Sequence, residues 1–420
     1  MPRTEEPVAR LRRALDPSEM SQRLAASLGP VRGLRVLRLY PDWRGGYVIL
    51  YGLGRGDGDA AREEVVFGRL AGEDAEQEAA ALRALLARKP SGGDGTMPVV
   101  ALADPGLVLQ PLGVDPRLPG IALLRKPGRF VDQLRSHAAT APPVEGGRFA
   151  LLSHRLGRRC TLRFHVAGPG PRSLIVKLFR RPERARRAFA TLAALHAQGF
   201  ATGAVRVPAP VALLEEAAIL VMEDAPGVPL LDVPSDRRVA MARAGGAALA
   251  RLHAAAAPEA GAHGPAEELA TLARWCDLAA RLRPEMAAPI AASAAAVRAG
   301  FAGLGPPPHQ ALLHRDLHER QILASGQVLS LLDFDTLARG EPALDLGNLL
   351  AHLALAGEPC QGELAAGFLA GYGIIERPAA RRLEVWTRAA LLRLACIHGS
   401  AQRDRLGAFS LLGSELPEAA

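Results

Sequence analysis

The sequence predicts an α+β fold, with sheets in its first half and helices in its second half. Two stretches, 33–111 and 148–223, each contain short apolar or alternating runs separated by glycine-containing turns, which is typical of antiparallel strands. From Ser235 onward the sequence is rich in alanine, and its leucines follow a helical spacing. Strands followed by helices indicate two regions of different architecture.

Composition indicates a globular chain with several domains. The 420 residues are 49% hydrophobic, enough for a sizeable core. No apolar run approaches the roughly 20 residues that span a bilayer, and the first residues mix acids with bases, unlike a signal peptide. Four scattered cysteines without a C-x-x-C pair favour a reducing compartment over a disulfide framework or a zinc site. We therefore expect a cytoplasmic protein without a membrane partner.

The net charge of +8 does not by itself indicate a nucleic-acid partner. Aromatic residues make up only 4% of the chain, too few for a surface that stacks on bases. The distribution of charge is more informative, because residues 148–206 are strongly cationic whereas residues 311–420 are net acidic. A cationic segment that faces carboxylates suits an anionic nucleotide held between two lobes, although a solvated basic face would give the same pattern.

The two strand-rich stretches share one order of elements. In the first we expect helices at 5–15 and 17–28, strands at 33–40, 47–53 and 64–70, a helix at 73–87, and strands at 97–100 and 106–111. In the second we expect two strands within 148–166, a strand at 173–179, a helix at 182–198 that stops at Gly199, and strands at 207–211 and 218–223. Arg69 and Lys177 are 108 residues apart, and Pro98 and Pro208 are 110 apart. These offsets predict an internal duplication, with independent use of a common pattern as the alternative.

These patterns divide the chain into three domains. Residues 1–140 are expected to form an N-terminal lobe, a degenerate duplicate without catalytic residues, joined to the rest by a linker at 138–147. Residues 148–226 form the second strand-rich unit, and residues 227–420 form a helical unit. Helices of this last unit are expected at 237–255, 266–283, 286–304, 361–371 and 379–398.

Acidic residues with a distinctive spacing lie at 311–350. Asp316 ends the tripeptide His-Arg-Asp, Gln321 follows five residues later, and an apolar run ends at Asp333. Phosphoryl transfer needs a carboxylate that accepts the hydroxyl proton and oxygen ligands that hold Mg²⁺ against the phosphates. Mg²⁺ accepts carboxylate and amide oxygens. A loop with Asp316 and Gln321 beside a strand end with Asp333 would supply one base and two metal-binding oxygens.

This segment resembles the catalytic core of the aminoglycoside phosphotransferase and choline kinase family. The resemblance implies a protein-kinase-like fold with an antiparallel-sheet N-lobe and a mostly helical C-lobe, here with an additional N-terminal α+β domain similar to the N-lobe. It also implies that Asp316 is the catalytic base and Asp333 the main Mg²⁺ ligand. His314 and Asp345 would brace the catalytic loop. The family usually has asparagine at the position of Gln321. Maltokinase-like members resemble this chain in having glutamine there, and glutamine offers Mg²⁺ the same amide oxygen.

Lys177 is the residue expected to contact the nucleotide phosphates. It lies in an apolar strand of a chain that otherwise favours arginine, and a compact ammonium suits that task. The resemblance gives it the same role. A helix carboxylate usually orients such a lysine, and the following helix offers only Glu183. Met222, Glu223 and Asp224 resemble the connection between the lobes, whose backbone groups would hold the adenine.

The sequence therefore predicts a small-molecule kinase that uses ATP and Mg²⁺ to phosphorylate a hydroxyl group, with a neutral sugar slightly favoured over an aminoglycoside. Residues 153–159 lack the G-x-G-x-x-G motif of protein kinases, which disfavours a protein substrate. The alternative is a catalytically inactive kinase-like module for nucleotide binding or interaction, which Gln321 and the missing helix glutamate favour. The sequence does not indicate an oligomeric state.

Overall fold

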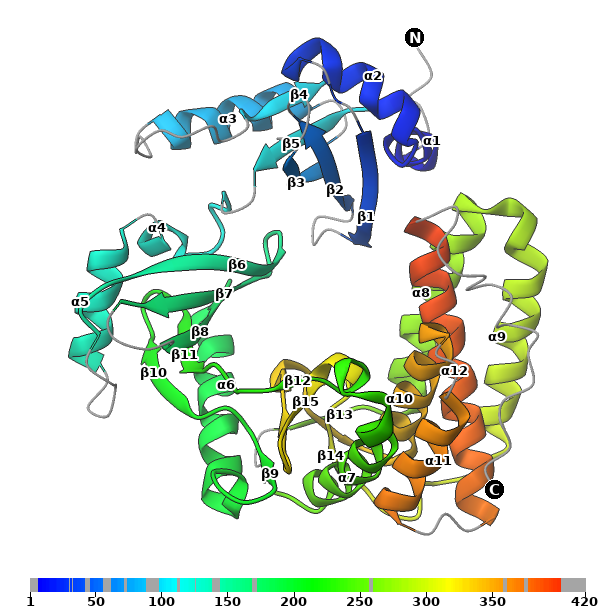
Figure 1. Cartoon of the computed structure of the whole chain (residues 1–420). Coiled ribbons are helices and arrows are strands. Elements are labelled where there is room, and N and C mark those ends of the chain that lie inside the picture. Colours follow the sequence, from blue (N-terminus) through cyan, green and yellow to red (C-terminus); the bar gives the residue numbers. More distant parts are fainter. Residues whose placement is uncertain are drawn as a thin grey trace.

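The computed structural model describes most of the chain (Figure 1). We call residues 7–115 the N-terminal unit, 118–223 the N-lobe and 228–401 the C-lobe. The predicted linker is described only from Val144 onward. The described residues are 7–29, 31, 33–41, 46–55, 62–71, 74–87, 98–111, 114–124, 126–137, 144–167, 172–256, 260–357, 361–373 and 377–401.

The N-terminal unit is a five-stranded antiparallel sheet with helices on both faces. Its elements are α1 (Pro7–Ala14), α2 (Pro17–Leu28), β1 (Gly33–Pro41), β2 (Tyr47–Arg55), β3 (Arg62–Leu70), α3 (Ala75–Ala87), β4 (Val100–Leu102) and β5 (Leu107–Pro111). The strand order is β1-β2-β3-β5-β4. Helix α3 packs on Val108, whereas α1 and α2 share a core with Leu107 and Leu109, because successive side chains of a strand point to opposite faces.

The N-lobe repeats this arrangement. Its elements are α4 (Ile121–Leu124), α5 (Pro127–His137), β6 (Gly147–Arg155), β7 (Arg159–Val166), β8 (Arg172–Phe179), α6 (Pro182–Leu195), β10 (Pro210–Leu214) and β11 (Ile219–Glu223). The strand order β6-β7-β8-β11-β10 is that of the first sheet, and a helix again follows the third strand. After α6 the chain turns at Gly199, whose φ of 88° suits glycine. The common strand order supports our proposal that the N-terminal unit is a degenerate duplicate of the N-lobe.

Helix α5 packs on the N-lobe sheet, although the sequence pattern grouped it with the N-terminal lobe. The ring centroid of Phe130 lies 5.0 Å from that of Phe164 in β7, and Leu134 belongs to the same core. The boundary that we propose between the two units therefore precedes α4.

The C-lobe is mainly helical. Its helices are α7 (Ser235–His253), α8 (Pro265–Leu282), α9 (Ala287–Ala302), α10 (Ala343–Ala356), α11 (Gln361–Tyr372) and α12 (Arg377–Ala401). Its small sheets contain β12 (Val228–Pro229), β13 (Gly261–Ala262), β14 (Ala311–Leu313), β15 (Ile322–Ser325), β16 (Val328–Leu331) and β17 (Ala338–Gly340). The short β9 (Val205–Arg206) pairs in parallel with β16. The predicted α+β fold, with an antiparallel sheet in the N-lobe and a mostly helical C-lobe, is confirmed.

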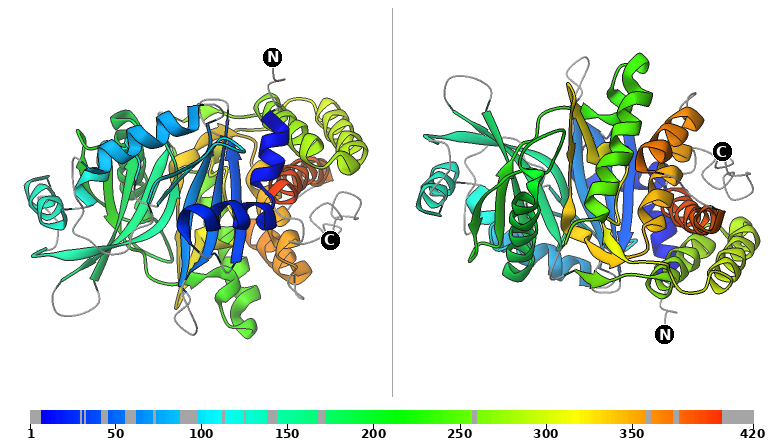
Figure 2. Two further views of the ribbon diagram at one scale, coloured as in Figure 1. Left: turned by 90° about the horizontal axis from the view of Figure 1, so that it is seen from above. Right: turned by 90° about the horizontal axis from the view of Figure 1, so that it is seen from below.

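The N-terminal unit contacts both lobes. On one side α1 lies against α8 and β1 against α12, and Leu278 and Leu282 of α8 belong to the apolar core of this unit. On the other side Val48 and Phe67 pack on Leu156, in the turn between β6 and β7. Figure 2 shows the unit, in blue, lying across the other two parts. Among the described residues, no helix is long and apolar enough to span a bilayer.

Candidate active site

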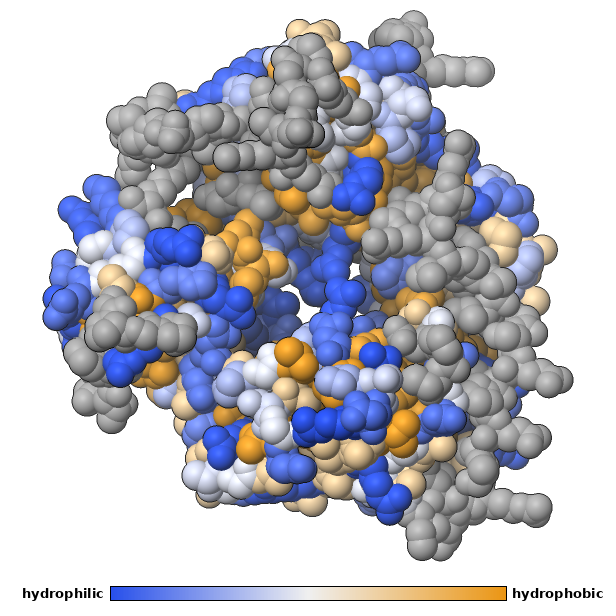
Figure 3. All heavy atoms as spheres, in the orientation of Figure 1, coloured by the Kyte–Doolittle hydropathy of each residue, from blue (hydrophilic) through white to orange (hydrophobic). Residues whose placement is uncertain are grey.

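The predicted catalytic loop and the strand end at Asp333 lie side by side in the C-lobe. Strand β15 begins directly after Gln321, and the backbone N–H of Leu332 donates to the Gln321 carbonyl over 3.0 Å. Asp333 therefore directly follows Leu332, which is hydrogen-bonded to Gln321. Asp316 lies half-buried in the loop between β14 and β15. Figure 3 shows hydrophilic residues in the hollow between the three parts of the molecule.

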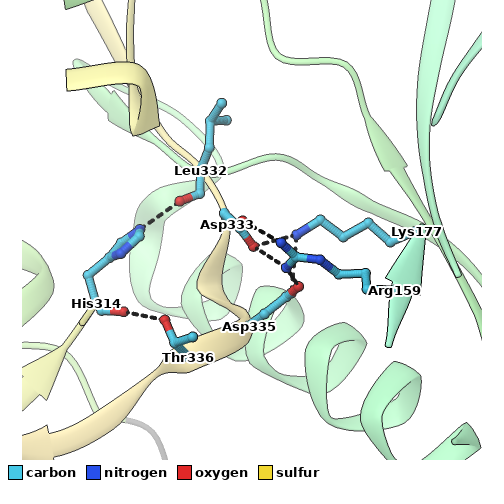
Figure 4. A network of polar contacts seen from close by, with 7 residues as sticks. All are labelled: Arg159, Lys177, His314, Leu332, Asp333, Asp335 and Thr336. Carbon is cyan, nitrogen blue, oxygen red and sulfur yellow. Dashed lines mark hydrogen bonds and ion pairs between the residues drawn. The ribbon is translucent and has the colours of Figure 1, made fainter. Parts of the chain in front are cut away.

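His314 joins the catalytic loop to the segment that contains Asp333. Its side chain is fully buried, and its Nε2 lies 2.6 Å from the carbonyl oxygen of Leu332. Its own carbonyl accepts a hydrogen bond from the Thr336 hydroxyl over 2.9 Å (Figure 4). These contacts join the loop to the segment around Asp333, and the bracing role of His314 stays a prediction.

Asp345, in the first turn of α10, holds the same loop. Its carboxylate accepts the backbone N–H groups of His314 and Arg315, each over 2.6 Å, and lies 3.0 Å from Nε2 of His253. Burial alone would raise the pKa of Asp345, but the hydrogen bond and charge of His253 lower it below its usual value. Asp345 therefore binds the loop as a carboxylate. His253, which also contacts the Tyr372 hydroxyl over 2.8 Å, is packed into this network.

Lys177 and Asp333 meet across the interface between the two lobes. Lys177 is 5% exposed, and its Nζ donates to Oδ1 of Asp333 over 2.8 Å and to Oδ1 of Asp335 over 3.1 Å (Figure 4). Asp333 adopts a left-handed backbone conformation, with φ 62° and ψ 65°, which is uncommon for residues other than glycine. The structure therefore brings together the lysine and the aspartate that the sequence singled out, from positions far apart in the chain.

Arg159 is a third member of this cluster, and sequence reasoning did not single it out. Its Nη1 and Nη2 donate to Oδ1 and Oδ2 of Asp333 over 2.9 and 3.2 Å, and Nη1 also donates to Asp335. Burial alone would raise the pKa of Asp333, but Lys177 and Arg159 hold it far below its usual range. Asp333 therefore carries a negative charge in this cluster.

The helix carboxylate that usually orients such a lysine is replaced here by aspartates of the other lobe. Glu183, the only candidate in the sequence, is exposed at the start of α6. The N-terminal unit has the pair that the N-lobe lacks, because Arg69 in β3 forms an ion pair with Glu78 in α3.

Met222, Glu223 and Asp224 lie at the end of β11, where the chain leaves the N-lobe. The Glu223 N–H donates to the Ala209 carbonyl over 2.8 Å, so it is engaged within the sheet. Asp224 accepts hydrogen bonds from Ser173 and forms an ion pair with Arg163. The predicted contact of this segment with adenine stays a prediction.

The carboxylate oxygens near Lys177 are of the kind that binds Mg²⁺. Carboxylates of Asp333 and Asp335 converge there, and the backbone carbonyl of Gln321 accepts a hydrogen bond from Leu332, the residue before Asp333. Mg²⁺ binds through one or two carboxylates and keeps water or phosphate oxygens as its other ligands. In the described part of the chain no cluster of three or more His, Cys, Asp or Glu forms an all-protein metal cage. Asp333 and Asp335 are thus the residues that could supply carboxylate oxygens to a metal here.

Comparison with known proteins gives the family. The family model described as the phosphotransferase enzyme family matches residues 158–386, more than half of the chain. The chain belongs to this family, so it is a small-molecule phosphotransferase with the predicted protein-kinase-like fold. No curated protein matches the chain.

Solved structures give weaker likenesses. A thermostable mutant of the aminoglycoside phosphotransferase APH(4)-Ia is 15% identical, with a TM-score of 0.47, over 63% of this chain and 93% of that one. Spectinomycin phosphotransferase APH(9)-Ia is 13% identical, with a TM-score of 0.49, over 68% and 92%. The macrolide 2'-phosphotransferase MphH from Brachybacterium faecium is 21% identical, with a TM-score of 0.43, over 69% and 97%.

Proposed function

We propose that the protein transfers the γ-phosphoryl group of ATP to a hydroxyl group of a small neutral molecule, with a sugar as the expected class. The observation that carries this proposal is the meeting of Lys177 with Asp333 and Asp335 beside the catalytic loop. A cation from one lobe and two carboxylates from the other are the groups that a metal–nucleotide complex needs on its two sides. We also expect the enzyme to work in the cytoplasm.

Each residue has a defined task in this reaction. Asp316 accepts the proton of the acceptor hydroxyl as that oxygen attacks the γ-phosphorus. Asp333 and Gln321 hold Mg²⁺, with Asp335 as a further carboxylate, and Lys177 binds the phosphates. Bound Mg²⁺ would neutralise charge on the phosphate oxygens. His314 keeps the loop in place through its bond to Leu332.

The charges around Asp316 favour a neutral acceptor over a polycationic aminoglycoside. Arg38 and Arg315 lie close enough to interact electrostatically with Asp316, whereas Arg320 is paired with Glu319. Glu268, which also interacts with Arg315, is itself paired with Arg393. A polycation approaching Asp316 would meet Arg38 and Arg315, and like charges at a binding site oppose association. A sugar hydroxyl has no such cost.

The test compares wild type with Asp316→Asn in the full chain. We expect wild type to bind ATP more tightly with Mg²⁺ than without it and to consume ATP in a panel of sugars, aminoglycosides and amino alcohols, with turnover on a sugar. Asp316→Asn should lose turnover by about 10³-fold or more while its ATP affinity changes little. Turnover on aminoglycosides alone would contradict the proposed acceptor class.

A catalytically inactive nucleotide-binding module is the second candidate. One observation favours it: Arg159 and Lys177 together engage both aspartates that a metal would need. ATP binding that ignores Mg²⁺, with no turnover on any acceptor, would support this reading and exclude the kinase.

A further inference from the structure

The turn between β6 and β7 lies where a kinase-like fold covers the phosphates, but its backbone N–H groups are already engaged. The Leu156 N–H donates to the Tyr40 hydroxyl over 3.0 Å, and the Gly157 N–H donates to Oδ2 of Asp115 over 2.6 Å. The Arg158 N–H donates to the Arg155 carbonyl over 2.9 Å. None of the three N–H groups of the turn is therefore available to a phosphate in this structure.

The N-terminal unit holds the turn firmly in this state. Asp115 is 2% exposed, and its carboxylate also lies 3.1 Å from Nε2 of His154. The His154 ring packs edge-on against Phe67, with 4.8 Å between centroids, and Leu156 is buried against Val48 and Phe67. Freeing the N–H groups would uncover this apolar contact and remove the Gly157 donor from a buried carboxylate, which is unfavourable.

Arg159, the first residue after the turn, faces the same way as Lys177. Thr161 is paired with Lys177 across β7 and β8, and Arg159 lies two residues before Thr161. Residues two apart on a strand, and residues directly opposite on paired strands, share one face of the sheet. The side chains of Arg159 and Lys177 converge on Asp333 for this reason (Figure 4).

We propose that Arg159 is the phosphate-binding residue of this hairpin and replaces the backbone N–H groups that the N-terminal unit engages. This inference rests on the proposed kinase function. A guanidinium presents paired N–H groups that fit phosphate oxygens as well as they fit a carboxylate. Without nucleotide, the same N–H groups of Arg159 donate to the carboxylates of Asp333 and Asp335. With nucleotide and metal bound, Arg159 exchanges these carboxylates for the phosphates, next to Lys177.

The experiment compares full-length wild type, Arg159→Gln, Arg159→Lys and Arg158→Gln by calorimetry with Mg²⁺-ADP and with adenosine. Arg158 is the matched control because it is an exposed arginine in the same turn. We expect Arg159→Gln to weaken Mg²⁺-ADP binding by about 10- to 100-fold while adenosine affinity stays within about twofold. Arg159→Lys should recover part of the loss, and Arg158→Gln should bind Mg²⁺-ADP like wild type.

Three results would overturn the inference while leaving the kinase proposal standing. They are an unchanged Mg²⁺-ADP affinity in Arg159→Gln, an equal loss for ADP and adenosine, and an equal loss in Arg158→Gln. A wild-type protein that binds neither ADP nor adenosine would instead remove the proposed function and this inference with it.

Metal binding without nucleotide gives a second readout. Because Arg159 competes for Asp333 and Asp335, Arg159→Gln should bind Mn²⁺ at least about threefold more tightly than wild type in electron paramagnetic resonance titrations. Equal Mn²⁺ affinity in the two proteins would show that the aspartates do not hold Arg159 back, contrary to the proposal.

Discussion

Asp345 binds the backbone of His314 through a hydrogen bond of 2.6 Å, and this bond fixes the start of the catalytic loop. The same carboxylate binds the next N–H, at Arg315, whose φ of 68° lies in the left-handed region. A non-glycine residue in that region needs support from its surroundings. The buried carboxylate supplies this support, and it thereby fixes the position of the loop backbone just before Asp316.

The first prediction concerns this carboxylate. Asp345→Asn keeps the shape of the side chain but removes its charge and turns one acceptor into a donor that faces backbone N–H groups or His253. We expect the free energy of unfolding to fall by about 2–4 kcal/mol, because hydrogen bonds to a charged group are lost and buried donors remain. Urea denaturation measures the change. Asp232→Asn, at an exposed position of the C-lobe, should stay within about 0.5 kcal/mol of wild type; an equally small effect at Asp345 would contradict the bracing role.

The second prediction concerns the contact between Asp115 and the β6–β7 turn. Asp115→Asn should weaken the bonds to Gly157 and His154, so the turn should open more often. We expect hydrogen exchange of the Leu156 and Gly157 amides to become about tenfold faster or more, since the carboxylate that accepts the Gly157 N–H loses its charge.

Asp104→Asn is the control for that measurement. Asp104 is an exposed aspartate of the N-terminal unit, bound by Arg13 and Arg23 over 2.6 and 2.7 Å, and it lies outside the turn. Its replacement should leave exchange at Leu156 and Gly157 unchanged. Unchanged exchange in Asp115→Asn as well would mean that the N-terminal unit does not hold the turn.

Local patterns were sufficient to predict the main strands of the two five-stranded units, most of the long helices and the loop that contains Asp316, but not α4, α5 or the short C-lobe strands β12, β13, β14 and β17. The spacing of apolar residues reflects contacts close in sequence, which is why the order of strands and helices along the chain was expected in both units, whereas the order of strands within each sheet was not. The loop was found from the spacing of Asp316, Gln321 and Asp333, and Lys177 from its unusual place in an apolar strand. The roles of Asp316 and Gln321 stay predictions.

Long-range contacts account for what the sequence did not reveal. Arg159 meets Asp333 across 174 positions of the chain, and Asp115 meets Gly157 only because the N-terminal unit folds over the N-lobe. Neither Arg159 nor Asp115 has an unusual sequence context, so the sequence pattern does not indicate that these residues make long-range contacts. Helix α5 likewise has an apolar face, and the sequence alone does not show which of the two sheets this face covers.

The third prediction concerns a buried ion pair that positions the start of the catalytic segment. Arg382 in α12 donates to both carboxylate oxygens of Glu341 over 3.0 Å, and also to the carbonyls of residues 304–306, where the proline run before β14 begins. Trp386 donates to the same carboxylate over 3.0 Å. Arg382→Gln leaves the buried Glu341 without its charge partner, so we expect unfolding to cost about 3–5 kcal/mol less.

A second arginine of α12 is the matched control for this variant. Arg388 forms an exposed pair with Glu384 over 2.8 Å, one helical turn away. Arg388→Gln should change the free energy of unfolding by no more than about 0.5 kcal/mol, because exposed pairs contribute little. Thermal and urea unfolding of both variants would show the difference, and similar values for the two would argue against a structural role for the buried pair.

The fourth prediction is a loss of stability in mild acid that arises at His352. Its ring lies over that of His318, with 5.0 Å between centroids, and burial together with the charges of His318 and Arg393 lowers its pKa to about 2. In the unfolded chain the same imidazole has a pKa near 6.5. Between these values the unfolded state binds more protons than the folded state, so the free energy of unfolding falls as pH falls. From pH 7 to pH 5 we expect His352 to account for a loss of about 2 kcal/mol. Urea denaturation across this range should give a shallower pH dependence for His352→Leu than for wild type; identical slopes would show that His352 is protonated in the folded protein as readily as in the unfolded one.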